Sequence, residues 1–164
     1  YLFKGTVEEN LKMAKPDATK EEMEAVLQKV NLLGFLQTQD GLQTQLLEKA
    51  SNLSGGQCQR LVIARALLRT DSAVYIFDEA ASNIDVESEE LIMNVIHELA
   101  KTKTVLLISH RLANVVKSDK IYFLKDGEIK ESGKHDELMS QNGAYRHLYE
   151  SQMALENYGK GGVA

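Results

Sequence analysis

The fold is decided by residues 53–68 of this 164-residue chain, which read LSGGQCQRLVIARALL. The sequence predicts a long amphipathic helix that begins at Ser54, because Leu61, Ala64 and Leu67 recur at helical spacing. The serine and the two glycines lie in its first turn. Several backbone N–H groups there have no partner within the helix, and the helix dipole is positive. Such an end attracts anions.

Two interpretations of Ser54 to Gln57 are open from these residues. As a phosphate site, Gly55 and Gly56 lack Cβ atoms, which lets a phosphate approach the backbone, and the Ser54 hydroxyl adds a donor. As a plain helix start, Ser54 and Gln57 form a capping box and the glycines give a tight entry. Taken alone, the capping box is the more frequent meaning of this pattern.

The pattern changes after this helix. Ala73 to Phe77 and Thr104 to Ile108 are short apolar runs, and apolar residues recur at helical spacing between them. This order predicts strand, helix and strand of a parallel sheet. The runs Ile121 to Lys125 and Glu128 to Ser132 flank Asp126-Gly127, which predicts a hairpin with a tight turn. Amphipathic helices are expected to follow.

The first part of the chain is expected to be helical. Thr6 with Glu9, and Thr19 with Glu22, match the capping box in which a hydroxyl and a carboxylate each bind the other residue's backbone N–H. Two helices are therefore predicted there. A third, short helix is predicted around Phe35 to Gln39.

Polar side chains follow both predicted strands at the end where open α/β sheets bind their ligands. Asp78 and Glu79 follow the first strand, and His110 follows the second. A carboxylate can hold Mg²⁺ and its neighbour can orient a water, whereas an isolated Asp-Glu pair is more often a solvated turn. An imidazole can contact a phosphate, or it can simply cap the strand.

In combination, these motifs resemble the ATP-binding cassette (ABC) family. LSGGQ is similar to the signature motif, which implies that Ser54, Gly55, Gly56 and Gln57 contact ATP held by another cassette. The strand ending in Asp78-Glu79 is similar to Walker B.

The resemblance implies roles for the polar residues at the strand ends. Asp78 would be the acid on the magnesium side, and Glu79 the catalytic base. His110-Arg111-Leu112 resembles the H-loop, which implies that His110 contacts the γ-phosphate. Ser82 to Asp85 resembles the D-loop and makes Asp85 a nucleotide-site candidate, although the family more often has Leu before the Asp.

The resemblance covers nearly the whole chain. It implies an α/β fold, the P-loop NTPase (RecA-like) core of an ABC ATPase with its helical signature-motif subdomain. We expect a partial nucleotide-binding domain at 1–158, divided into a helical part at about 1–70 and the remaining core at 71–158, and a flexible tail at 159–164. No G-x-x-x-x-G-K-[ST] motif occurs in the sequence. The core is therefore expected to be incomplete, and the isolated chain to be marginally stable and to self-associate through exposed strand edges.

Two further stretches are similar to exporter-type cassettes. Phe3 to Leu11 resembles the segment that follows their Q-loop, and Asp40 to Thr44 with Glu48 resembles the stretch before their signature. The resemblance makes Glu48 a candidate contact to transmembrane domains, although an exposed charge at a helix end is nearly as common. Ala50 stands where the family usually has Gly.

Charge and composition limit the other functions. The net charge of −5 and the pI near 5.4 give no broad basic field, so no nucleic-acid partner is expected. The single cysteine, Cys58, cannot form an internal disulfide, which favours a reducing, cytosolic setting. Apolar runs are far shorter than the roughly 20 residues that span a bilayer. Any membrane anchor would come from other segments.

The sequence therefore predicts an ATP-hydrolysing module of an ABC exporter, using ATP and Mg²⁺. A second nucleotide-binding domain and the transporter's transmembrane domains would be its partners, at the cytoplasmic face of the cell membrane. Two alternatives stay open: a soluble ABC-type ATPase of DNA repair, chromosomes or ribosomes, and a non-catalytic interaction fragment. Without a P-loop, the isolated chain is expected to be inactive.

Overall fold

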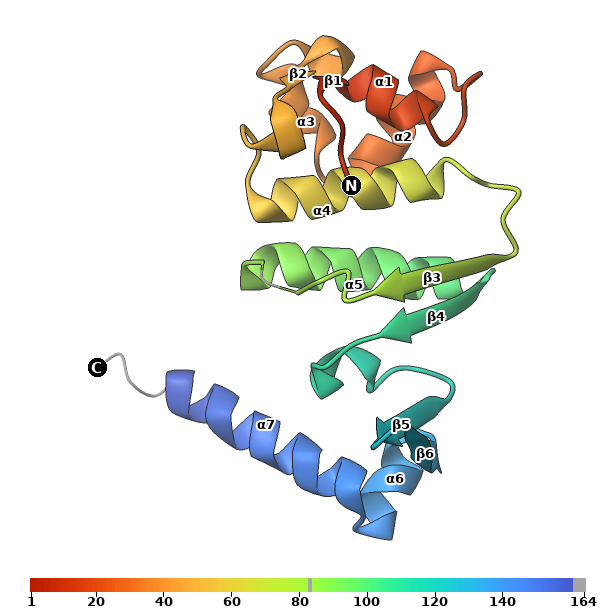
Figure 1. Cartoon of the computed structure of the whole chain (residues 1–164), viewed down its shortest axis with the longest axis vertical. Coiled ribbons are helices and arrows are strands. Elements are labelled where there is room, and N and C mark those ends of the chain that lie inside the picture. Colours follow the sequence, from red (N-terminus) through yellow and green to blue (C-terminus); the bar gives the residue numbers. More distant parts are fainter. Residues whose placement is uncertain (83, 161–164) are drawn as a thin grey trace. The chain divides into compact units, whose positions relative to one another are not determined.

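A computed structural model of the chain describes residues 1–82 and 84–160, with side chains described as far as Leu155. The chain forms two compact units, Tyr1–Leu106 and Leu107–Ala164, and each is described by itself (Figure 1). Asn83 of the predicted D-loop and residues 161–164 of the predicted tail lie outside the described residues. The predicted division near residue 70 concerns the complete family fold and stays a prediction.

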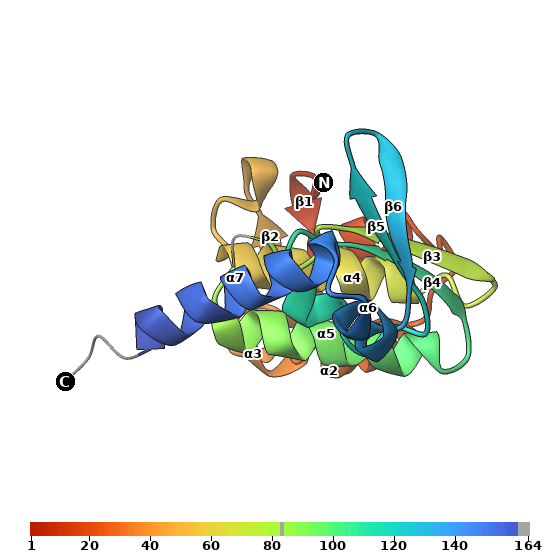
Figure 2. The ribbon, with the colours of Figure 1, turned by 90° about the horizontal axis from the view of Figure 1, so that it is seen from below.

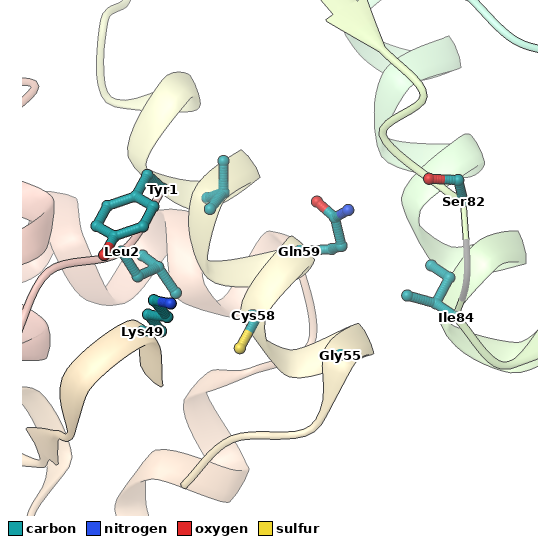
Figure 3. A pocket seen from close by; sticks show the side chains of 9 residues that line it. Tyr1, Leu2, Lys49, Gly55, Cys58, Gln59, Ser82 and Ile84 are labelled. Carbon is teal, nitrogen blue, oxygen red and sulfur yellow. The ribbon is translucent and has the colours of Figure 1, made fainter. Parts of the chain in front are cut away.

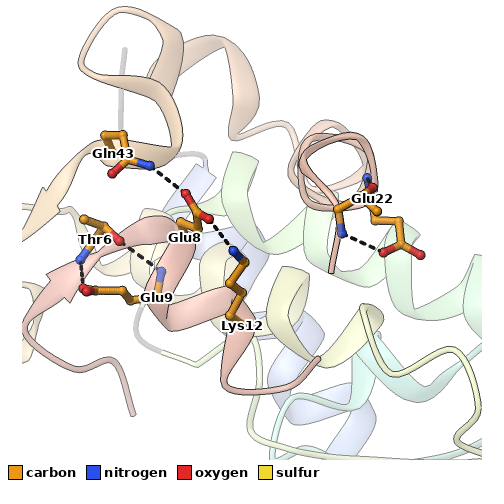
Figure 4. Close-up of polar contacts among 7 residues, drawn as sticks. Thr6, Glu8, Glu9, Lys12, Glu22 and Gln43 are labelled. Atoms are coloured by element: carbon orange, nitrogen blue, oxygen red, sulfur yellow. Dashed lines mark hydrogen bonds and ion pairs between the residues drawn. The ribbon is translucent and has the colours of Figure 1, made fainter. Parts of the chain in front are cut away.

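Helices of the first unit begin where the capping boxes predict. Thr6 Oγ1 accepts a hydrogen bond from Glu9 N at 3.0 Å, and Glu9 Oε2 accepts one from Thr6 N at 2.7 Å (Figure 4). The same reciprocal pair joins Thr19 and Glu22 at 3.3 and 3.0 Å. The helices of this unit are α1 (Val7–Lys12), α2 (Lys20–Lys29), α3 (Leu33–Gln37), α4 (Gly55–Leu67) and α5 (Val86–Ala100).

Helix α3 differs from its prediction. It begins at Leu33, two residues earlier than the predicted start at Phe35, so Gly34 lies inside the helix. Leu32 and Leu36, one helical turn apart, are both fully buried. Burial of this pair outweighs the low helix propensity of glycine.

The core of the first unit forms where α1, α2 and α4 pack together, and α5 packs on α4. Each helix buries one apolar face, as the helical spacing predicts. This packing fixes α4, which carries the signature stretch. The fully buried large side chains of the unit are Val7, Leu11, Met23, Leu27, Leu32, Leu36, Leu46, Leu61, Ile92 and Ile96.

A two-stranded sheet lies next to α5. Its strands are β3 (Val74–Asp78) and β4 (Thr104–Ile108), and the arrows in Figure 1 run the same way, as predicted for a parallel pair. Along β3, Tyr75 and Phe77 are buried, whereas Val74 and Ile76 are exposed. This alternation places one apolar face of the strand inside the unit and leaves the other uncovered.

The structure adds a small sheet that the sequence did not predict. Strands β1 (Gly5–Thr6) and β2 (Gln45–Leu46) pair antiparallel, with Gly5 opposite Leu46. The Glu8 carboxylate strengthens the connection: it accepts from Gln43 Nε2 at 2.6 Å and from Lys12 Nζ at 2.5 Å (Figure 4). The Lys12 hydrogen bond is the main reason that the pKa of Glu8 is lowered. These contacts hold the segment before the signature against α1.

The second unit starts with the last two residues of β4, followed by the single turn η3 (Leu112–Val115) and the predicted hairpin. Strands β5 (Ile121–Lys125) and β6 (Glu128–Gly133) pair antiparallel, with an irregularity between Phe123 and Leu124. Asp126 and Gly127 both have positive φ, at 54° and 76°, which confirms the tight Asp-Gly turn.

Two helices complete this unit, α6 (His135–Gln141) and α7 (Ala144–Lys160), and Figure 2 shows α7 from below. Helix α7 includes Gly159 and Lys160, which the sequence predicts to be part of a flexible tail. The buried core is Leu112, Val115, Ile121, Leu138 and Tyr145. Among the described residues, no helix combines the length and the apolar composition that crossing a membrane requires.

Candidate functional site

The predicted capping box is present at the start of α4, and backbone N–H groups of the first turn are still without partners within the helix. Ser54 Oγ accepts from Gln57 N at 3.2 Å, and Gln57 Oε1 accepts from Ser54 N at 2.8 Å. The first hydrogen bond within the helix joins Cys58 N to Ser54 O at 2.9 Å. The amides of Gly55 and Gly56 precede it and have no partner within the helix. The capping box is therefore confirmed, and the phosphate-site interpretation stays a prediction.

The two glycines have different surroundings. Gly55 is exposed, and its φ is not in the left-handed region, so its backbone conformation does not require glycine. Gly56 is buried against the start of α5. A Cβ on Gly56 would collide with Ser88 Oγ and would lie 2.8 Å from Ser88 Cβ and 3.1 Å from Asp85 Oδ2. Gly56 therefore serves the packing of two helices, which the sequence did not indicate.

This contact brings Asp85, a predicted site residue, to the signature stretch. Asp85 is the N-cap of α5, and its Oδ1 accepts from Ser88 N at 2.8 Å. Hydrogen bonds from the backbone and side chain of Ser88 lower the pKa of Asp85, and the charge of Arg60 adds to the effect. The starts of α4 and α5 thus form one cluster around Gly56.

A hollow of about 440 Å³ runs along α4 beside this cluster (Figure 3). Gly55, Cys58 and Gln59 line it from α4, and Lys49 and Tyr1 lie on one side, with Ser82 on the other. It gives solvent-sized molecules access to the glycine end of the helix. Lys49 supplies a positive charge at its wall.

Cys58 is a structural thiol in this setting. Its Sγ lies 3.6 Å from the Ala50 carbonyl oxygen, to which it donates. Burial raises the pKa of the Cys58 thiol, which favours the protonated form and opposes reactivity. The position at a helix start does not reverse this effect.

Asp78 and Glu79 lie in the same unit, at the end of β3. Asp78 is the last residue of the strand and Glu79 follows with φ of 49°, in the left-handed region that favours glycine. A turn follows, closed by Ser82 N donating to Glu79 O at 3.0 Å. The strand geometry thus ends abruptly at Glu79, in a backbone conformation that the sequence gave no reason to expect.

Asp78 could supply one carboxylate ligand of a magnesium site. Its side chain is exposed at the strand end. Mg²⁺ is usually bound through one or two carboxylates, with waters and substrate phosphates completing the octahedron. Within the described ranges, His, Cys, Asp and Glu side chains do not gather in groups of three or more.

His110 belongs to the second unit. It is exposed, two residues after β4, and its backbone is fixed by Gln152 of α7. Gln152 Nε2 donates to His110 O at 2.8 Å, and Gln152 Oε1 accepts from Leu112 N at 2.9 Å. Sequence reasoning missed Gln152, because nothing in a polar residue of an amphipathic helix signals a contact 42 residues away.

Comparisons with known proteins agree with these motifs. The sequence model of the ABC transporter family matches residues 2–82. An uncharacterized ABC transporter ATP-binding protein of Haemophilus influenzae is 53% identical over 156 residues, which are 95% of this chain and 28% of that protein. An ATP-dependent lipid A-core flippase of Mannheimia succiniciproducens is 44% identical over 93% of this chain and 26% of its own length.

A solved structure is also similar. A bacterial Atm1-family ABC exporter with ATP bound superposes with a TM-score of 0.84 and 30% identity, covering 92% of this chain and 26% of that protein. This chain thus spans about a quarter of the length of the relatives that it matches. The shared fold and the matched motifs place the chain in the ABC transporter family, as part of an ATP-binding cassette.

Proposed function

We propose that this chain is part of the ATP-hydrolysing module of an ABC exporter. Its α4 would present the signature motif to ATP bound on the P-loop of a partner cassette. The carrying observation is the α4 start, where the capped helix end is exposed at Ser54 and Gly55 and offers the Gly55 amide to an anion.

Each site residue would have a separate task. Ser54 Oγ accepts from Gln57 N, so its own proton stays available for a phosphate oxygen. The helix dipole and the amides would stabilise charge on the transferring phosphoryl group. Glu79 would hold and deprotonate the attacking water, and His110 would contact the γ-phosphate.

Mg²⁺ would be held on the Asp78 side of the site. When bound, the ion neutralises charge on the phosphates. Asp78 would bind it directly or through water, while Glu79 stays available for the nucleophile. Asp85, as the cap of α5, would complete the site from the loop that follows Walker B.

The partners follow from the exporter assignment. A second nucleotide-binding domain would supply the nucleotide, and transmembrane domains of the full-length protein would hold the module at the cytoplasmic face of the membrane. Two relatives support this proposal: the lipid A-core flippase and the Atm1-family exporter are transporters by name. Glu48, exposed at the start of the turn η2 (Glu48–Ala50), is a candidate contact for those domains.

Complementation between two defective cassettes tests the proposal. One cassette, extended through its P-loop, carries Glu79→Gln, and the other carries Gly55→Glu. Gly55→Glu suits the helix, because an acidic side chain is favourable in the first turn, yet it repels a phosphate. Mixed dimers, purified through two different tags, contain one site with intact Glu79 and an intact signature from the partner.

The expected result is that both homodimers are inactive and mixed dimers recover up to about half of the wild-type turnover, since one of two sites is intact. Mixed dimers as inactive as both homodimers would contradict the proposed arrangement. Glu79→Gln with full activity would contradict the role of Glu79. The 164-residue chain alone is expected to show no turnover.

A further inference from the structure

The contact between α4 and α5 leaves no room for a side chain at Gly56. Gly56 is the second residue of α4, and Ser88 lies in the first turn of α5, where it is 7% exposed. Carbon atoms in contact normally lie about 3.5–4.0 Å apart. A Cβ on Gly56 would lie only 2.8 Å from Ser88 Cβ. Rotation of the serine hydroxyl does not relieve this overlap, because Ser88 Cβ is fixed to the α5 backbone.

Polar contacts fix the same two helix starts. Ser88 N donates to Asp85 Oδ1 at 2.8 Å, so Ser88 belongs to the capped turn of α5. On the α4 side, Arg60 Nε donates to the Gly56 carbonyl oxygen at 3.3 Å, and Arg60 NH1 donates to Asn31 O at 2.9 Å. The positive charge of Arg60 also acts on Asp85. The position of Gly56 is thus set from both sides.

We infer that Ser88 is a positioning residue: with Asp85 it forms a seat for Gly56 that holds the phosphate-binding end of α4 at a fixed distance from the loop after Glu79. This inference rests on the proposed function. It identifies Ser88 as the residue that fixes the position of the signature amides relative to the start of α5. Ser88 touches no nucleotide in this role. It acts through Gly56, whose lack of a side chain permits the contact.

A series of substitutions in the full-length protein tests the seat. Gly56→Ala adds one methyl group, which must move about 0.7 Å to reach a normal contact with Ser88 Cβ. A displacement near 1 Å in a catalytic site lowers rates by about 100-fold, so kcat is expected to fall about 10- to 100-fold. KM for ATP is expected to change less than about threefold, because the P-loop holds the nucleotide in either case.

The decisive variants combine Gly56→Ala with changes at Ser88. Ser88→Gly removes both serine atoms that the new methyl group would meet, so Gly56→Ala/Ser88→Gly should recover most of the lost kcat. Ser88→Ala keeps Cβ, so Gly56→Ala/Ser88→Ala should recover little. Gly34→Ala is the matched control for glycine replacement in a helix, since a Cβ there meets nothing within 4 Å. It should leave kcat and KM as in the wild type.

Hydrogen exchange gives a readout that does not depend on turnover. In the nucleotide-free protein, amides of residues 54–60 should exchange faster in Gly56→Ala and return toward wild-type rates in Gly56→Ala/Ser88→Gly. Equal kcat recovery by Ser88→Gly and Ser88→Ala, or no recovery by either, would overturn the seat. Wild-type protein without ATPase activity would instead refute the proposed function, while the exchange experiment would still decide the contact.

Discussion

Glu79 combines a proposed role as catalytic base with an unfavourable backbone conformation, and Glu79→Gly separates the two. Its φ of 49° costs a non-glycine residue about 1–2 kcal/mol. Glycine adopts this conformation freely but loses about 0.5–1 kcal/mol through the greater entropy of its unfolded chain. The net expectation is that Glu79→Gly raises the free energy of unfolding by about 0.5–1 kcal/mol while ATP hydrolysis is lost.

Equilibrium urea unfolding of a nucleotide-free cassette, extended through its P-loop, measures this difference, and melting should rise by about 1–4 °C. Asp78→Gly is the matched control. Asp78 is an exposed acid too, but it lies in the extended strand, where glycine should lower stability by about 0.5–1 kcal/mol. Equal destabilisation by the two variants would refute the conclusion that the backbone of Glu79 is strained.

Three further outcomes are expected. Gln152→Leu removes the hydrogen bonds to His110 O and from Leu112 N, so kcat should fall and hydrogen exchange after β4 should rise. Gly143→Ala should lower the free energy of unfolding by about 1 kcal/mol, because its Cβ would lie 2.6 Å from the Glu131 oxygen that caps α7; urea titration measures this. Asp85 has a lowered pKa, so its stabilising effect is complete above its ordinary value of 3.8 and is lost as pH falls further. Asp85→Asn should therefore approach wild-type stability in acid unfolding below about pH 4, whereas a constant difference would contradict this linkage.

Local signals in the sequence predict the elements well. Three capping boxes give the starts of α1, α2 and α4, because a hydroxyl and a carboxylate or amide three residues apart satisfy each other's backbone. The hairpin can be predicted in the same way, because the tight turn depends on only two adjacent residues, Asp126 and Gly127. The order of strand, helix and strand follows from the spacing of apolar residues.

Contacts between distant segments are what the sequence does not reveal. The pairing of β1 with β2 joins residues about 40 apart in two-residue strands, which carry no periodicity. The sequence suggests that Gly56 is a phosphate-site glycine, and it gives no sign that Gly56 packs against Ser88. Gln152 is similar, because its two hydrogen bonds depend on where α7 lies.

A positive φ occurs at Ala50, where the resemblance to the family implies that glycine is usual. Ala50 stands where the family usually has Gly, and the structure gives it a φ of 53°. Glycine is the residue that adopts this conformation without steric cost. The backbone conformation of Ala50 thus gives a physical reason for glycine at this position.

The seat at Gly56 has a consequence for how such sequences diverge. Because Ser88 Cβ lies only 2.8 Å from where a methyl group on Gly56 would be, substitutions at the two positions depend on each other. A lineage that gained a side chain at the second signature glycine would first have to lose one at the position of Ser88. Descendants should therefore carry the two changes together, in that historical order.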